Sequence, residues 1–156
     1  FSLYQMGCIK SKLNNTTFNN TNTFTLSKKK CKVKVLRVYD GDTLWIALKL
    51  HKQFYKFKVR MLGYDSPELH PRLNKQDRAE EITKAVAAKK YIENLVLNKI
   101  VNAEFYDFDK YGRPLCNLYI DDPDRCRIPC PNKVCVNTLM IRNNHGYPYM
   151  GGTKKN

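Results

Sequence analysis

Three short motifs place carboxylates and arginines at predicted turns between apolar runs. They are Asp40-Gly41-Asp42-Thr43, Arg60 with the following Asp65-Ser66-Pro67-Glu68, and Asp109-Lys110-Tyr111-Gly112-Arg113. Hydrolysis of a phosphodiester needs a nucleophilic water, neutralisation of the phosphate charge, and in-line alignment of the attacking and leaving oxygens. Carboxylates and guanidinium groups can serve all these needs, so the motifs predict a site where a metal ion and a phosphate meet.

The carboxylates divide into metal ligands and a base. Asp42 and Asp65 offer hard oxygens suited to calcium or magnesium, and the backbone carbonyl of Ser66 could supply another ligand. Glu68 lies three residues beyond Asp65 across a turn stiffened by Pro67, so it can reach the same pocket without binding the metal directly. It is therefore the candidate general base, acting directly or through a water.

The two arginines are the candidates for stabilising the transition state. Arg60 and Arg113 carry planar donor forks that match pairs of phosphate oxygens. Taken singly, each motif has a simpler explanation, because Asp-Gly-Asp is a common hairpin turn and Ser-Pro-Glu a common loop or helix start. Their order and context along one chain, rather than any single motif, favour a catalytic site.

The elements that position these motifs follow from the hydrophobic pattern. Along residues 54–62 apolar and cationic residues alternate, which predicts a strand with one core face and one cationic face. Five short strands with a helix inserted after the third predict an α+β fold, a five-stranded Greek-key barrel of the oligonucleotide-binding (OB) type with a short C-terminal helix. We expect strands at 31–39, 43–50, 54–62, 100–106 and 115–120, a helix at 76–98, a loop at 121–135 and a short helix at about 136–143.

The charge of the chain favours a polyanionic partner. It has 28 Lys+Arg against 14 Asp+Glu, a net charge of +14, which predicts binding to nucleic acid or to an acidic membrane surface. There is no apolar run of about 18 residues and no apolar core of a secretory signal. We therefore expect a monomer that lies inside the cell, in the cytoplasm or tethered to a membrane face.

The six cysteines are expected as reduced thiols, because they lack a compact paired spacing. Cys126, Cys130 and Cys135, together with Cys116, invite interpretation as a zinc site. Their spacing departs from the Cys-x-x-Cys pairs of strong zinc sites, so thiols in a loop are favoured.

Residues 1–30 are interpreted as an N-terminal arm, and residues 31–156 as the folded domain. The arm is rich in Asn and Thr without periodicity, which predicts a disordered or loosely attached segment. Within it, Met6-Gly7-Cys8-Ile9-Lys10-Ser11 matches the N-myristoylation pattern, with Cys8 placed for palmitoylation. If the natural chain starts at Met6, acylation at Gly7 and Cys8 would tether it to a membrane; if it starts upstream, the match is accidental.

The order of the motifs resembles the staphylococcal nuclease family, also called thermonucleases. The resemblance runs from about Val33 to Lys154 and includes Val136-Asn137 after the three motifs. The ending Tyr147-Pro148-Tyr149-Met150-Gly151-Gly152-Thr153-Lys154 is most similar to shorter members from eukaryotes and their large DNA viruses. The resemblance implies an OB barrel with helices and calcium-dependent cleavage of DNA and RNA that leaves 3′-phosphate and 5′-hydroxyl ends.

The resemblance also implies a role for each motif residue. Ser66 stands where the family usually has threonine, which matters little if only its carbonyl binds metal. Magnesium or manganese are alternatives to calcium as the working ion. By resemblance the calcium ligands are Asp42, Asp65 and the Ser66 carbonyl, the general base is Glu68, the phosphate-binding arginines are Arg60 and Arg113, the supporting acid is Asp40, and the substrate-binding residues are Lys110, Tyr111, Tyr147 and Tyr149.

A non-catalytic OB module that only binds nucleic acid is the alternative function. Such a module does not need a ring of carboxylates facing a polyanion, since like charges repel. The joint presence of Asp42, Asp65 and Glu68 with both arginines therefore favours the enzyme.

Overall fold

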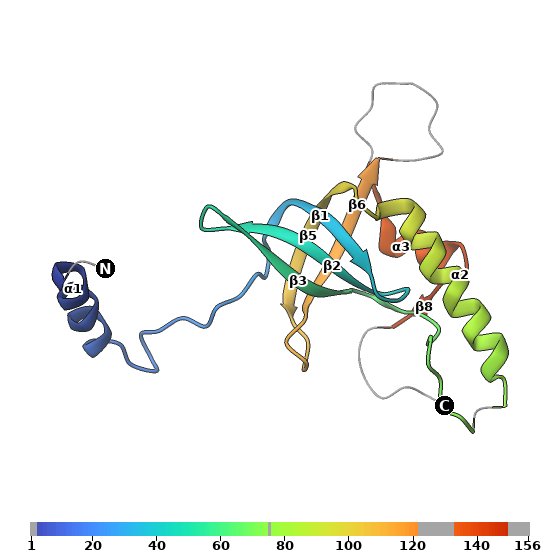
Figure 1. The fold of residues 1–156 in the computed structure, drawn as a ribbon, viewed down its shortest axis with the longest axis horizontal. Helices are drawn as coiled ribbons and strands as arrows, with labels where there is room; N and C mark the ends of the chain where they lie inside the picture. The colour runs from blue at the N-terminus through green and yellow to red at the C-terminus, as the bar shows by residue number, and fades with distance from the viewer. Residues whose placement is uncertain (1–2, 75, 122–132, 150–156) are drawn as a thin grey trace.

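The computed structural model describes residues 3–74, 76–121 and 133–149 as a small barrel covered by helices at one end (Figure 1). The α+β fold predicted from the sequence is confirmed, with the long helix inserted after the third strand and a short helix near the C-terminus. In chain order the elements are α1 Leu3–Asn14, β1 Lys30–Val38, β2 Thr43–Leu50, β3 Gln53–Met61, β4 Tyr64–Asp65, α2 Arg78–Val96, β5 Ile100–Phe108, β6 Pro114–Asp121, β7 Lys133–Cys135, α3 Val136–Arg142 and β8 Tyr147–Pro148.

Five strands close the barrel. The antiparallel order β3-β2-β1-β5-β6 is completed by a parallel pairing of β3 with β6, at Arg60 opposite Leu115 and Met61 opposite Cys116. The short β7 continues the sheet beyond β6. Closure brings the end of β3, which carries Arg60, beside the start of β6, which follows Arg113.

Two hairpin turns shape the β1-β2-β3 part of the barrel. The predicted turn at residues 40–42 joins β1 to β2, and the Tyr39 N–H donates to the Thr43 carbonyl over 2.9 Å. The turn from β2 to β3 contains only His51 and Lys52, with φ of 46° and 74°, between the paired Leu50 and Gln53. Positive φ at both residues is the geometry of a type I′ turn, whose twist matches that of the flanking strands.

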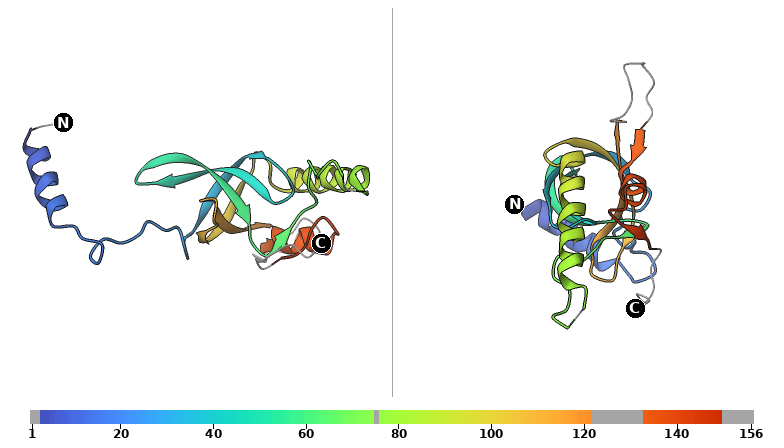
Figure 2. Two further views of the ribbon diagram at one scale, coloured as in Figure 1. Left: turned by 90° about the horizontal axis from the view of Figure 1, so that it is seen from below. Right: turned by 90° about the vertical axis from the view of Figure 1, so that its right-hand side faces the viewer.

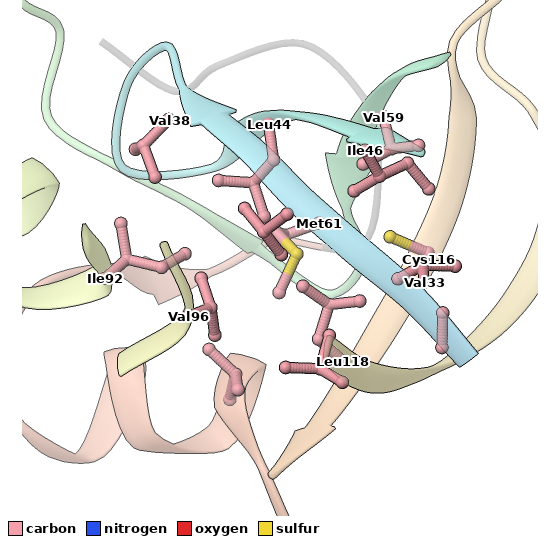
Figure 3. Close-up of a cluster of buried hydrophobic side chains, with 14 of the residues drawn as sticks. Val33, Val38, Leu44, Ile46, Val59, Met61, Ile92, Val96, Cys116 and Leu118 are labelled. Carbon is pink, nitrogen blue, oxygen red and sulfur yellow. The ribbon is translucent and has the colours of Figure 1, made fainter. Parts of the chain in front are cut away.

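The core lies inside the barrel and beneath α2 (Figure 3). On β3 the predicted alternation is confirmed, because Val59 and Met61 are fully buried, whereas Lys56 is exposed and Lys58 and Arg60 are half-buried. Helix α2 buries Ala88, Ile92 and Val96, a spacing of four residues that keeps one stripe of the helix on the barrel. This helix, predicted at residues 76–98, therefore supports the barrel from one side.

A two-stranded sheet of β4 and β8 lies beside the barrel and was not predicted from the sequence. Tyr64 pairs with Pro148 and Asp65 with Tyr147, so the segment after β3 is joined to residues near the C-terminus. Next to it, the buried Tyr64 hydroxyl donates to the Gly41 carbonyl over 2.6 Å. Asp65 is thereby fixed by contacts with two distant parts of the chain.

The N-terminal segment differs from the expected arm in two ways. Residues 3–14 form helix α1, which stands apart from the barrel in Figure 1 and in the left view of Figure 2. The chain joins the barrel before residue 30, because Leu26 is 2% exposed in the core and the Lys28 N–H donates to the Phe105 carbonyl over 2.8 Å. Acylation at Gly7 and Cys8 stays a prediction. Among the described residues, no helix is long and apolar enough to cross a membrane.

Replacement of Leu26 tests where the folded domain begins. Leu26→Ala should lower the free energy of unfolding by about 2–5 kcal/mol, because it empties a core position. Phe18→Ala, at a residue 98% exposed, should change it by less than about 0.5 kcal/mol. Urea unfolding followed by the fluorescence of the single tryptophan measures both values. Equal effects of the two substitutions would contradict the anchoring of the chain at Leu26.

Candidate active site

The three motifs converge on one open cleft of about 1030 Å³. The turn between β1 and β2 brings Asp40 and Asp42 to it, and the end of β3 brings Arg60. The segment from β4 onward contributes Asp65 and the residues up to His70, while the turn between β5 and β6 contributes residues 109–113. Segments far apart in the sequence therefore meet where the motifs predicted a common site.

One guanidinium joins the two candidate metal ligands. Arg60 Nη1 donates to Asp42 Oδ1 over 2.8 Å, and Arg60 Nη2 donates to Asp65 Oδ1 over 2.7 Å. The carboxylate side chains are 5% and 6% exposed, and the Arg60 side chain 17%. Both charges are thus nearly removed from water and depend on the same counter-charge.

Asp42 accepts several hydrogen bonds besides the one from Arg60. Its Oδ1 also accepts from Thr43 Oγ1 over 2.9 Å, and its Oδ2 accepts from the Ser66 N–H over 3.0 Å and from Ser66 Oγ over 3.3 Å. Burial, reinforced by the nearby Asp40 carboxylate and opposed by Arg60, raises the pKa of Asp42 to about 6. The predicted supporting acid Asp40 also holds the turn, since its Oδ1 accepts from the Asp42 N–H over 3.1 Å.

Gly41 allows the turn to approach the ligand loop. A Cβ at this position would lie 2.6 Å from Ser66 Cβ and 2.9 Å from Ser66 Oγ, closer than real Cβ contacts. Glycine here therefore allows the turn to pack closely against the Ser66 side chain, which the hairpin interpretation of Asp40-Gly41-Asp42 did not include.

The chemistry of the donor set fits a hard cation. When ionised, the three carboxylates Asp40, Asp42 and Asp65 face one guanidinium, so the site carries excess negative charge in largely buried surroundings. Among the described residues no three His, Cys, Asp or Glu side chains converge on one metal position. Asp42 and Asp65 are the buried carboxylates that Arg60 joins, and together with the Ser66 backbone carbonyl they stay the predicted metal ligands.

Arg113 is oriented by Asp109 and Thr43. Asp109 Oδ2 accepts from Arg113 Nε over 2.7 Å, and Asp109 Oδ1 accepts from the backbone N–H groups of Tyr111 and Arg113 over 2.9 and 2.8 Å. Arg113 Nη1 donates to Thr43 Oγ1 over 3.4 Å. Thr43 thus links this arginine to Asp42. Both orienting residues belong to the quoted motifs, but no local sequence signal distinguishes them from residues that only form turns.

Glu68, the candidate base, lies at the rim of the cleft with an exposed side chain. Its backbone N–H donates to Glu81 Oε1 over 3.3 Å, and Glu81 belongs to the first turn of α2. The start of the scaffold helix thereby contacts the loop that carries Glu68.

The predicted substrate-binding residues take up different positions. Lys110 and Tyr111 line the cleft, and Tyr111 is 71% exposed with Arg113 against its ring at 5.4 Å. Tyr149 lines the cleft as well. Tyr147 does not line it; its hydroxyl donates to Asp65 Oδ2 over 2.9 Å from the paired strand β8. The structure therefore places the Tyr147 hydroxyl on Asp65, and the contact of Tyr147 with substrate stays a prediction.

The cysteines described by the structure lie away from the cleft. Cys116 is fully buried in the barrel, and burial raises the pKa of its thiol to about 12. Cys31, Cys116 and Cys135 form no disulfide with one another. Cys126 and Cys130 lie outside the described residues, so the zinc interpretation of this region stays open.

Comparison with known proteins agrees with this geometry. The family model described as staphylococcal nuclease homologue matches residues 58–149, more than half of the chain. An uncharacterized protein of Methanocaldococcus jannaschii is 30% identical over 121 residues, which cover 68% of this chain and 56% of the archaeal protein. The chain thus spans little more than half the length of this relative. With its closed barrel, its helix after the third strand and its motif residues gathered in one cleft, the chain belongs to the family of staphylococcal nuclease homologues.

Proposed function

We propose that the protein is a calcium-dependent nuclease that hydrolyses phosphodiester bonds of DNA and RNA with low sequence specificity and leaves 3′-phosphate and 5′-hydroxyl ends. The family is one of nucleases and nucleic-acid binding proteins and is typically metal-dependent. The observation that carries the proposal is the convergence in one cleft of two buried aspartates, two oriented arginines and one exposed glutamate.

Asp42 and Asp65, with the Ser66 carbonyl, would hold the calcium ion. When bound, the ion supplies positive charge against the phosphate and activates water. The two carboxylates that would bind the ion are themselves fixed in position, because Ser66 and Thr43 donate hydrogen bonds to Asp42 while Tyr147 donates one to Asp65. Their hydrogen bonds limit reorganisation on binding, which is the purpose of a supporting shell around metal ligands.

Glu68 is proposed as the general base. Its side chain is exposed at the cleft rim, where a water can lie between it and a phosphate. The carboxylate accepts the proton of the attacking water, so the oxygen becomes nucleophilic as it approaches phosphorus. Pro67 and the contact with Glu81 restrict the loop that presents this group.

The two arginines are proposed to bind the phosphate oxygens, but they differ in how many of their donors are already hydrogen-bonded within the protein. Arg113 is positioned by Asp109 and leaves part of its donor fork toward the cleft. Arg60 has both terminal nitrogens on the carboxylates, so it can turn to a phosphate only when another positive charge faces Asp42 and Asp65. This charge balance couples phosphate binding by Arg60 to occupation of the metal site.

A binding module without catalysis is the alternative function within the same family. It would use the basic charge and the exposed Tyr111, which suit binding to a single strand. The buried carboxylate pair disfavours it, because two aspartates beside a phosphate weaken binding unless a cation is present. Cleavage assays separate the two functions.

Glu68→Gln tests the proposed base. Turnover of labelled single-stranded DNA in calcium should fall by about 10²–10⁴-fold, because the amide cannot accept a proton, while affinity for the strand stays within about twofold. The matched control is Glu93→Gln on α2, outside the cleft, which should keep full turnover. EDTA should abolish cleavage by the unmodified protein. Loss of turnover and affinity in equal measure would remove Glu68 from the role of base.

Asp42→Asn tests the metal site without relying on activity. Calcium should raise the melting temperature of the unmodified protein, with about 2.7 kcal/mol of added stability at a concentration of 100 times Kd. Asp42→Asn should lose this calcium-induced shift, because the amide lacks the charge that binds the ion. Asp121→Asn, at a side chain 91% exposed, should retain it. A full shift in Asp42→Asn would place the ion elsewhere.

Asp109→Asn tests how Arg113 is held. Burial raises the pKa of Asp109, but the hydrogen bonds from Arg113 and Tyr111 outweigh it and the net shift is downward. The stabilisation is therefore present above the unfolded pKa of about 3.9 and is lost as pH falls through the folded value. The variant should lose about 1–3 kcal/mol of stability at pH 7, and the deficit should shrink in strong acid.

Unfolding free energies at several pH values check this dependence, with Asp107→Asn at an exposed neighbouring residue as the control. A deficit that stays constant down to pH 2 would show that the charge of Asp109 does not matter. Cleavage by Asp109→Asn should also fall, since Arg113 loses its orientation.

A further inference from the structure

The outward face of the β2–β3 hairpin carries three lysine–aromatic pairs. Each lysine Nζ lies over a ring on the strand beside it or at the adjoining turn, and none of these residues belongs to the catalytic groups described above. We call this surface the hairpin face. Its pairs are Lys58 over Tyr39 at 4.2 Å, Lys56 over Trp45 at 5.4 Å and Lys49 over Phe54 at 5.9 Å from the ring centroid.

The hairpin face is continuous with the cleft. Lys56, Lys58 and Arg60 occupy alternate positions of β3, so they project from the same side of the strand. Arg60 and Tyr39 both line the cleft, while the far pair lies near the tip of the hairpin. From Arg60 to Phe54 the strand advances six residues, or about 20 Å. A length of this order accommodates several nucleotides of an extended strand, within the site size of an OB fold.

The surface is open and uniformly cationic. Phe54 is 75% exposed and Tyr39 46%, and residues 43–61 contain no Asp or Glu. Exposed Lys34 and Arg37 on β1 pair with Ala47 and Trp45 of β2, which widens the positive surface. Figure 1 and the left view of Figure 2 show the hairpin extending away from α2, so the helices do not cover it.

We propose that the hairpin face is a track on which a single strand of nucleic acid lies as it leaves the cleft, with bases stacked on Tyr39, Trp45 and Phe54 and phosphates bound by the paired lysines. The proposal rests on the proposed function, because the strand enters from the catalytic cleft. It extends that function by predicting that longer strands bind more tightly than those that fill the cleft alone.

The relative strengths of base–aromatic and lysine–aromatic contacts favour replacement of each lysine on its ring by a base. A base stacked on an aromatic ring contributes more than a lysine over the same ring in solvent, and the displaced lysine gains a phosphate partner. An acidic membrane could also attract the lysines. A membrane lying on this face would obstruct the cleft at Tyr39, so the continuity of the two surfaces favours nucleic acid.

The single tryptophan makes the track directly measurable. With Glu68→Gln protein in calcium, an oligothymidylate of about 12 nucleotides should quench Trp45 fluorescence, whereas a 5′-phosphorylated dinucleotide that fills only the cleft should not. The same oligonucleotide should bind more tightly than the dinucleotide. Vesicles of phosphatidylserine and phosphatidylcholine are the probe for the membrane alternative.

Paired variants locate the contacts. Lys56→Ala/Lys58→Ala should weaken binding of the 12-nucleotide strand and lower the slope of log affinity against log salt by about 1.4, the value for two lost phosphate contacts. The control Lys90→Ala/Arg142→Ala removes the same charge from exposed positions on α2 and α3 and should leave the slope unchanged. Phe54→Ala removes a highly exposed ring, so it should lower the affinity for the 12-nucleotide strand about fivefold or more without affecting the fold.

Three outcomes would overturn the track. One is an unquenched Trp45 with equal affinity of long strand and dinucleotide. Another is equal loss of affinity in the lysine pair and its control. The third is quenching by anionic vesicles but not by oligonucleotide, which would assign the face to a membrane. Cleavage by the unmodified protein is measured in parallel. Cleavage without binding to the hairpin face would contradict only the track. Length-dependent binding without cleavage would support the track and contradict the proposed nuclease activity.

Discussion

The structure around the cleft depends on one charge constraint: two nearly buried carboxylates share a single guanidinium. Asp42 and Asp65 are so little exposed that an unpaired charge on either would cost several kcal/mol of stability. Burial of both as carboxylates therefore depends on Arg60. The turn after β1, the end of β3 and strand β4 must therefore meet within hydrogen-bonding distance. The same arrangement leaves the cluster short of positive charge, which is why it suits a cation.

Long-range pairings give this cluster its fixed geometry. The β3–β6 pairing closes the barrel at Arg60 itself, and β8 pairs with Asp65 and supplies the Tyr147 hydroxyl. The turn at Gly41 approaches the loop of Asp65 so closely that a single added methyl group would collide with Ser66. Core packing, sheet closure and the placement of Asp42 and Asp65 therefore depend on one another, because a shift of β3, β4 or the turn at Gly41 would break an ion pair with Arg60.

Much of this arrangement could be predicted from local pattern, and the rest depends on contacts between distant residues. Alternation along residues 54–62 identified β3, and helical spacing placed α2 within two residues of its ends, since both signals lie within one element. Nothing local distinguishes Leu26 as a core residue or Tyr147 as a support for Asp65, because their partners lie far along the chain. The connection between the predicted strands at 43–50 and 54–62 is in the expected place, but its turn type was not predicted, since His51 and Lys52 adopt positive φ without the usual glycine or asparagine.

The separation of opposite charges along β3 explains how a carboxylate cluster can receive a polyanion. Arg60 lies among the aspartates, and Lys56 lies four residues away, a distance of about 13 Å along the strand. The Debye length at physiological ionic strength is about 8 Å, so repulsion by the carboxylates is largely screened at the hairpin lysines. Attraction of a phosphate chain and binding of a cation can then be optimised separately on one strand. The net charge of +14 adds a long-range field that attracts polyanions from any side, while the buried carboxylates act only at short range within the cleft.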